Sequence, residues 1–235
     1  MNVVDIILPA VAIGGTAAWG TFHPQSQLWG RIIRNVPAGC ALTFDDGPNP
    51  EVTPRLLRLL EKHEIPATFF VLGKHATEYP GLVAEVADRG HVIGNHTYAH
   101  HSLVFFSREH IVDELRRCDD AVFKAAGKRT KCVRPPFGFR GPQFFSAARA
   151  SGFSEIVMWS VNGHDWNPQT PLDMQRRLQK VSAGDIVLLH DGDHQTSKAN
   201  RDHMLQALEF WIPRWKDAGI RFETPVADIQ RVKMP

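Results

Sequence analysis

The chain has 235 residues, 43% hydrophobic and 22% charged, so it can bury the core of one compact domain and is not disordered as a whole. Its 27 Lys and Arg against 25 Asp and Glu leave a formal net charge of +2, which excludes nucleic-acid binding through a large basic surface. The three cysteines are far apart and form no CxxC pair, so neither a disulfide framework nor a thiolate metal site is supported. Any metal must be bound by the 12 histidines and by carboxylates.

The N-terminal apolar segment, residues 1–36, is expected to precede the main domain. Residues 3–20 are mostly apolar but contain Asp5 and Pro9, and no Lys or Arg occurs before Arg31. Three interpretations stay open: a membrane anchor, a segment packed on the domain, and an atypical cleaved secretion signal. Because these interpretations differ in where they place the protein, its localisation also stays open. A cytoplasmic or membrane-anchored protein is favoured.

Residues 37–235 alternate short β-prone runs with helical patterns. A helix is predicted to begin at Thr53 and Pro54, another runs from the capping Ser107 to Gly127, and a third covers 200–218. The alternation predicts a single α/β domain with a parallel sheet, and seven strands would close, or nearly close, a (β/α) barrel with its site at the C-terminal strand ends. The seven predicted strands are Cys40–Asp45, Ala67–Leu72, His91–Asn95, Lys131–Arg134, Glu155–Val161, Asp185–His190 and Ile220–Glu223.

Carboxylates and imidazoles follow the first and third predicted strands. Asp45 and Asp46 lead into a Gly-Pro turn, and taken alone they could be a solvated turn. Adjacent carboxylates can also divide two tasks, one binding a cation and the other accepting a proton. His96 and His100 have the i, i+4 spacing that lets two side chains bind one metal. Two His and one Asp leave coordination positions open, which is typical of a catalytic metal site.

Three further strand ends carry polar groups. Arg134 precedes the rigid loop Pro135-Pro136-Phe137-Gly138, Asp165 and Trp166 follow the fifth strand, and His190 ends the sixth. These polar groups have no obvious structural need, although a His that closes an apolar strand, taken alone, is more often an ordinary rim residue than a catalyst. Because parallel strands end at the same edge, five strand ends with such groups together indicate an active site.

These stretches resemble the five ordered motifs of the polysaccharide deacetylases, the NodB-homology domain of carbohydrate esterase family four. The resemblance covers the chain from about residue 39 to about residue 230, and the first two motifs are highly specific. It implies a distorted (β/α) barrel of about seven strands. The matching residues are Thr43-Phe44-Asp45-Asp46-Gly47-Pro48, His96-Thr97-Tyr98-Ala99-His100, Arg134-Pro135-Pro136-Phe137-Gly138, Asp165-Trp166 and Leu188-Leu189-His190.

The resemblance also implies a metal and a base. Asp46, His96 and His100 would hold a divalent cation, for which Zn²⁺ suits imidazole and carboxylate best, with Co²⁺ or another divalent ion left open. Such a cation would polarise the acetamide carbonyl and acidify a water molecule. Asp45 would be the general base, held in place and ionised by Arg134.

The remaining motif residues would complete the reaction. His190 would be the general acid that protonates the departing amine, oriented by Asp165. The backbone N–H of Phe137 would stabilise the oxyanion, and Trp166 and Leu188 would form the wall of a pocket for the acetyl methyl group.

The sequence departs from the family pattern at two positions. Phe137 stands where the family commonly has Tyr, which removes a hydroxyl contact but keeps the backbone N–H. Asn162 stands three residues before Asp165, where the family often has Asp, and keeps hydrogen bonding without the charge. Neither departure is expected to abolish activity.

The sequence therefore predicts metal-dependent hydrolysis of the N-acetyl group of an N-acetylglucosamine-containing glycan, such as a chitin oligomer or peptidoglycan, with release of acetate. One alternative is a deacetylase or amidase for a small non-polymeric or glycolipid substrate. A second is a catalytically inactive carbohydrate-binding module, although binding alone has no use for both Asp45 and His190. The expected partner is the glycan, with membrane association through the N-terminal segment left open. We expect a monomer and no nucleic acid.

Overall fold

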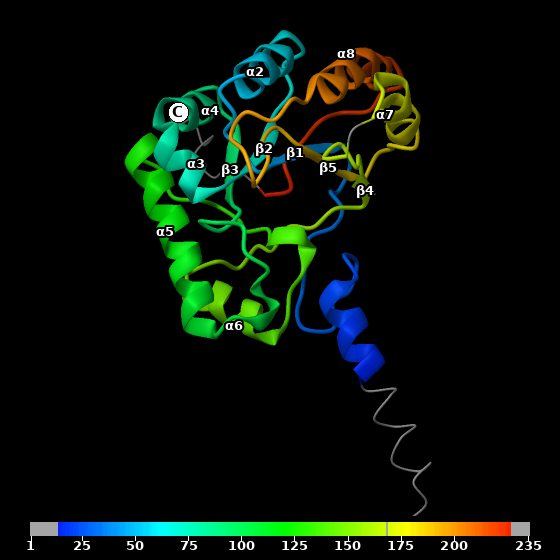
Figure 1. Ribbon diagram of the computed structural model, residues 1–235. Helices are drawn as coiled ribbons and strands as arrows, with labels where there is room; N and C mark the ends of the chain where they lie inside the picture. The colour runs from blue at the N-terminus through cyan, green and yellow to red at the C-terminus, as the bar shows by residue number, and fades with distance from the viewer. Residues whose placement is uncertain (1–13, 168, 227–235) are drawn as a thin grey trace, which may run out of the picture.

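The computed structural model describes residues 14–167 and 169–226, and these fold around one parallel β-sheet (Figure 1). Five strands follow the order β3-β2-β1-β5-β4, and every pair is parallel. The strands are almost entirely buried, as expected for a sheet with both faces covered. The bounds are β1 Ala41–Asp45, β2 Ala67–Val71, β3 Val92–Asn95, β4 Val161–Asn162 and β5 Ile186–His190.

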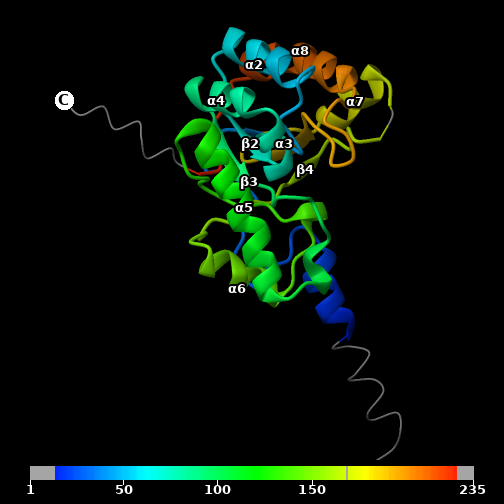
Figure 2. The same cartoon turned by 60° about the vertical axis from the view of Figure 1, so that its left-hand side comes forward.

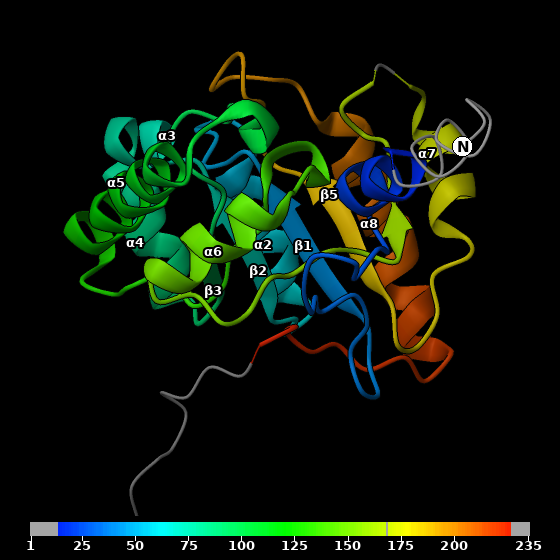
Figure 3. The same cartoon turned by 90° about the horizontal axis from the view of Figure 1, so that it is seen from below.

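Helices cover the sheet on its two faces and lie beside its β3 edge. Figure 3, which views the molecule from below, shows α2 and α8 behind the strands and α6 in front of them, while Figure 2 shows the length of α5. The helices are α2 Thr53–Lys62, α3 Gly73–Glu78, α4 Pro80–Asp88, α5 Arg108–Ala126, α6 Pro142–Ala150, α7 Pro171–Leu178 and α8 Asp202–Asp217. Two 3-10 turns lie in the connecting loops: η1 Leu103–Phe105 between β3 and α5, and η2 Pro136–Gly138 between α5 and α6.

Successive side chains of a strand point to opposite faces, so the sheet builds two apolar cores. On β1, Leu42 and Phe44 enter the core under α2 and α8, whereas Ala41 enters the other core. The second core also contains Val133 and Met158 from the loops between β3 and β4. The sheet is therefore fixed from both sides, and its strand ends are held firmly in place.

The predicted helices and their boundaries follow local chemistry. Pro54 lies in the first turn of α2, where its missing N–H is not needed. The Ser107 side chain accepts a hydrogen bond from the backbone N–H of His110 at the start of α5, and Gly127 ends that helix with φ of 64°. The predicted helix over 200–218 is α8.

The prediction of seven strands in a closed barrel is not confirmed, because the described residues form five strands. The runs Lys131–Arg134 and Ile220–Glu223 contribute only isolated bridges, and Glu155–Val161 contributes the start of β4. Pro135 and Pro136 follow the first run directly, and they have no backbone N–H with which to extend a ladder. The bridges outside the strands include Asn95 with Val133, Val133 with Ile156, and Cys40 with Phe222.

The N-terminal segment is described only from residue 14 onward. Residues 14–22 are helical, and the chain then runs to β1. None of the described helices is long and apolar enough to cross a membrane. Most of the apolar stretch 3–20, on which the membrane-anchor interpretation depends, lies outside the described residues.

Candidate active site

The site lies at the carboxyl edge of the sheet, where three strands end. Asp45 is the last residue of β1 and His190 the last residue of β5, and the two are paired in register. His96 directly follows β3. Ligand sites of parallel α/β sheets form at this edge, since all strands end there together.

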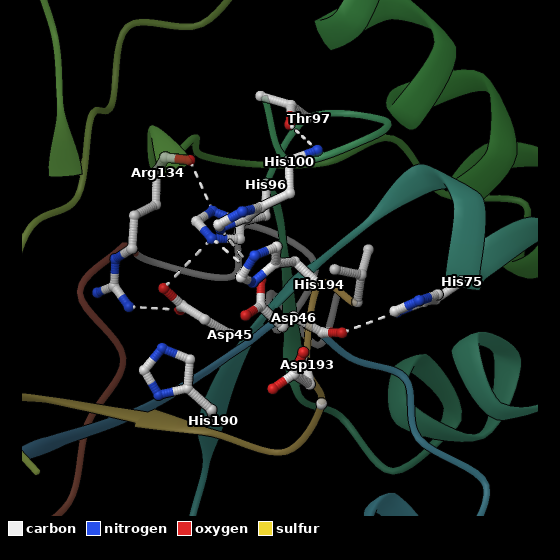
Figure 4. Close-up of polar contacts among 12 residues, drawn as sticks. Asp45, Asp46, His75, His96, Thr97, His100, Arg134, His190, Asp193 and His194 are labelled. Carbon is white, nitrogen blue, oxygen red and sulfur yellow. Dashed lines mark hydrogen bonds and ion pairs between the residues drawn. The ribbon is translucent and has the colours of Figure 1, made fainter. Parts of the chain in front are cut away.

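Asp46, His96 and His100 converge on one point (Figure 4). The Oδ1 atom of Asp46 lies 3.6 Å from Nε2 of His96 and 3.3 Å from Nε2 of His100. All three side chains are buried. Asp46 and His100 have φ angles of 67° and 63°, an uncommon conformation for residues other than glycine and one found where the surrounding fold imposes it.

The three residues fit a divalent cation. The ring of His96 is bonded through Nδ1 to the carbonyl oxygen of Arg134 at 2.8 Å, so Nδ1 carries the proton and Nε2 keeps its lone pair for the centre. Among the described residues, buried Oδ1 of Asp46 and Nδ1 of His100 have no hydrogen-bond partner. A carboxylate oxygen that faces two imidazole nitrogens in this way is a ready ligand set for Zn²⁺ or a similar ion.

Burial shifts the pKa values of the three candidate ligands. Burial raises the pKa of Asp46 to about 7, with the neighbouring Asp45 adding to the effect. Burial lowers the pKa of His96 to about 4 and that of His100 well below its ordinary range. A bound cation favours the ionised carboxylate and the neutral imidazoles, which are the forms that ligate.

Asp45 is held beside this centre by Arg134. The Nη1 atom of Arg134 donates to Oδ1 of Asp45 at 2.7 Å and to the Thr43 hydroxyl at 2.9 Å. The guanidinium is completely buried, and it also donates to the carbonyl oxygens of Val157 and Met158. The other carboxylate oxygen of Asp45 lies 3.6 Å from Nε2 of His96. One oxygen is therefore fixed by an ion pair while the other faces the centre.

His190 forms a second fixed pair with Asp165. Its ring Nδ1 bonds to Oδ1 of Asp165 at 2.8 Å, and its backbone N–H donates to Oδ2 at 2.7 Å. Burial alone would lower the pKa of His190, but the charge and hydrogen bond of Asp165, with the charges of Asp46 and Asp45, outweigh it and raise the pKa to about 9. Since Nδ1 is engaged, Nε2 is the nitrogen that can serve a substrate.

These groups lie in one cavity of about 630 Å³, which is large enough for a drug-sized ligand. Leu188 and Trp166 line its wall, and the Trp166 ring lies edge-on to His190 at 5.2 Å. Phe137 also lines the cavity and packs edge-on against His100 at 4.6 Å, with φ of 58° in the turn η2. The structure thus brings every predicted site residue to this cavity or, for Arg134 and Asp165, directly behind it.

The structure adds residues that the sequence did not point to. The ring of His194 stacks on that of His100 at 4.5 Å and lines the cavity, and Figure 4 shows it in front of Asp46. Its position four residues after His190 was the only available signal. Phe22 and Pro24, from the N-terminal segment, also line the cavity, and no motif marked them.

Comparisons with known proteins agree with this geometry. The family model for polysaccharide deacetylase matches residues 36–156. The chain is 35% identical over 187 residues to a Bacillus cereus protein named peptidoglycan-N-acetylglucosamine deacetylase, covering 80% of this chain and 66% of that protein. It is 35% identical over 185 residues to a chitooligosaccharide deacetylase of Sinorhizobium fredii, covering 76% and 86%.

A solved structure shows the same fold. The crystal structure of the peptidoglycan N-acetylglucosamine deacetylase Bc1960, in complex with a hydroxamate-type benzamide, superposes with a TM-score of 0.73 at 34% identity. The match covers 81% of this chain and 89% of that one. By contrast, the chain spans just under two thirds of the Bacillus cereus sequence relative, which is a longer protein.

Proposed function

This chain belongs to the polysaccharide deacetylase family, and we propose that it hydrolyses the N-acetyl group of N-acetylglucosamine residues in a glycan, with a divalent metal held by Asp46, His96 and His100. One observation carries the proposal: the buried Oδ1 of Asp46 faces two imidazole nitrogens beside a fixed carboxylate and a fixed imidazole. Acetate and a free amine are the products.

Asp45 serves as the general base. Its ion pair with Arg134 leaves one carboxylate oxygen toward the centre, where a water molecule can give up its proton. A cation held by Asp46, His96 and His100, Zn²⁺ by the preference of this ligand set, would supply Lewis acidity to polarise the amide carbonyl and to acidify that water.

His190 serves as the general acid. Asp165 keeps it charged and fixes its ring, so that Nε2 can protonate the departing amine nitrogen. The backbone N–H of Phe137 supports the negative charge that develops on the carbonyl oxygen. Leu188 and Trp166 exclude water around the acetyl methyl group.

A deacetylase for a small or glycolipid sugar remains the main alternative, and a glycan-binding protein without activity is the other. The names of the relatives support the polymer: they are a peptidoglycan-N-acetylglucosamine deacetylase and a chitooligosaccharide deacetylase. The paired Asp45 and His190 support catalysis, because two buried, oppositely charged proton-transfer groups are not needed for binding.

The test is acetate release from a panel of chitin oligomers, peptidoglycan and an N-acetylated glycolipid, with Asp45→Asn as the matched inactive control. We expect the wild-type chain to release acetate from the oligomers or peptidoglycan far above the control. Release from the glycolipid alone would favour the alternative substrate, and no release from any of them would overturn the proposal.

A further inference from the structure

We propose that Phe22, in the N-terminal segment ahead of the family match, is a stacking platform for the sugar ring next to the one that is deacetylated. The inference rests on the proposed function and names the part of the glycan that this segment recognises. It makes Phe22 a specificity-determining residue that favours oligomers over a single sugar.

A row of aromatic rings leads from the metal ligands to Phe22. The ring centroid of His100 lies 4.6 Å from that of Phe137, Phe137 lies 5.7 Å from Phe139, and Phe139 lies 5.0 Å from Phe22. All four residues line the same cavity. A sugar whose acetamide reaches Asp46 lies beside His100, where this row of rings begins. The next sugar of the glycan then lies against Phe22, where the row ends.

Phe22 is exposed where an apolar side chain would normally be covered. It is 46% exposed and Phe137 is 45% exposed, and together they form an apolar surface beside a floor of carboxylates and imidazoles. A pyranose ring matches such a surface, because its C–H face is apolar while its edge carries hydroxyl groups. Aromatic rings contribute stacking area of this kind with little loss of conformational freedom.

The segment that carries Phe22 is fastened to the rest of the site by Arg140. This guanidinium is 1% exposed and donates to the carbonyl oxygens of His23, Pro24 and Ser26. It also donates to the carbonyl oxygen of Gly138 in η2, at 2.8 Å.

Carbonyl oxygens are the only partners of this buried charge among the described residues. A buried cation needs such partners, since it is costly to leave without them. Three of the four carbonyl oxygens that accept hydrogen bonds from the Arg140 side chain belong to this segment, so its loss would leave the buried guanidinium with one acceptor. The backbone around Phe22 is therefore a built part of the cavity wall, held to the same loop as Phe137.

The experiment compares kcat/KM for N-acetylglucosamine, its dimer and its tetramer in wild type and Phe22→Ala. We expect the variant to lose up to about tenfold on the tetramer, the scale of one aromatic packing contact, and clearly less on the single sugar. Phe22→Trp should restore the preference for the tetramer. Leu28→Ala is the matched control, because Leu28 is 45% exposed in the same segment but does not line the cavity.

Binding provides a second readout that needs no turnover. In the Asp45→Asn background, adding Phe22→Ala should raise the Kd for the tetramer by up to about tenfold. An equal loss of kcat/KM on the single sugar and on the tetramer, or an unchanged Kd for the tetramer, would refute the proposal that Phe22 stacks on the neighbouring sugar. Absence of acetate release by the wild-type chain would contradict the proposed function instead, so the two failures are distinguishable.

Discussion

The floor and the rim of the cavity are built in opposite ways. The floor residues are at most 9% exposed, and they come from strand ends, from the loops after them and, for Arg134, from the segment that forms a bridge at Val133. Of the rim residues, Phe22, Phe137 and Trp166 are 40–46% exposed and come from loops and the N-terminal segment. The floor comprises Asp45, Asp46, His96, His100, Arg134, Asp165 and His190, and the rim comprises Phe22, Phe137, Phe139 and Trp166.

The difference separates chemistry from recognition. Proton-transfer and metal-binding groups need fixed positions, and the floor supplies them through paired charges such as Arg134 with Asp45. Sugar rings need flat apolar area that is open to solvent, and the rim supplies it. Floor variants should therefore lower kcat, whereas rim variants should raise KM.

Removing the metal should have the largest effect. A strong chelator should bring acetate release down to background, and Zn²⁺ or Co²⁺ should restore it, because we propose that Asp46, His96 and His100 hold about one ion per chain. Elemental analysis beside the assay checks the stoichiometry. Fully active protein that contains no divalent metal would refute this prediction.

Asp45→Asn should lower kcat by about 10²–10⁴-fold, the usual contribution of a positioned proton-transfer group. The metal should stay bound, because Asp46 supplies the ligand oxygen. Asp46→Asn is the contrasting control and should lose the metal. If Asp45→Asn loses the metal instead, Asp45 is a ligand and the division between the two carboxylates is wrong.

Asp165→Asn should change the pH profile of kcat/KM. The pKa of His190 is raised to about 9, and the acid must be protonated, so wild-type activity should fall as the pH rises through about 9. Without the Asp165 charge this basic limb should move by about one to three units to lower pH, while the acidic limb stays in place. A basic limb that does not move would show that Asp165 is not the partner of His190.

The same pair makes a prediction for stability. Because the pKa of His190 is higher in the folded chain than its ordinary value of 6.5, the pair stabilises the fold fully below pH 6.5 and loses this effect as the pH rises through about 9. The Tm difference between wild type and Asp165→Asn should thus be larger at pH 6 than at pH 10. A difference independent of pH would contradict the ion pair.

Trp166→Ala should have the smallest effect, on the rim. We expect KM to rise by up to about tenfold with a smaller change in kcat, because an apolar wall of the cavity is lost while Asp165 still holds His190, on which the Trp166 ring packs. Steady-state kinetics on a chitin tetramer measure both constants. Phe105→Ala is the control, since Phe105 is 87% exposed and does not line the cavity. A fall in kcat at constant KM would place Trp166 with the floor.

The contrast also explains what the sequence could predict. Asp45 and His190 end predicted strands, and parallel strands end at one edge, so their meeting follows from the alternation of strands and helices. Phe22 is placed at the cavity by Arg140, which holds His23 and Pro24, and by its own ring contact with Phe139. These contacts join residues far apart in the chain, and no periodicity marks them. The strand predicted at Lys131–Arg134 fails for a local reason, since Pro135 and Pro136 have no backbone N–H to continue a ladder beyond the bridge at Val133.

The most direct test of the account is product analysis after incubating a chitin tetramer with the metal-loaded chain. We expect acetate and free amine in equal amounts, an oligomer of unchanged length, and no product once a chelator is added. Shortened oligomers, or a tetramer that binds and is recovered fully acetylated, would contradict it.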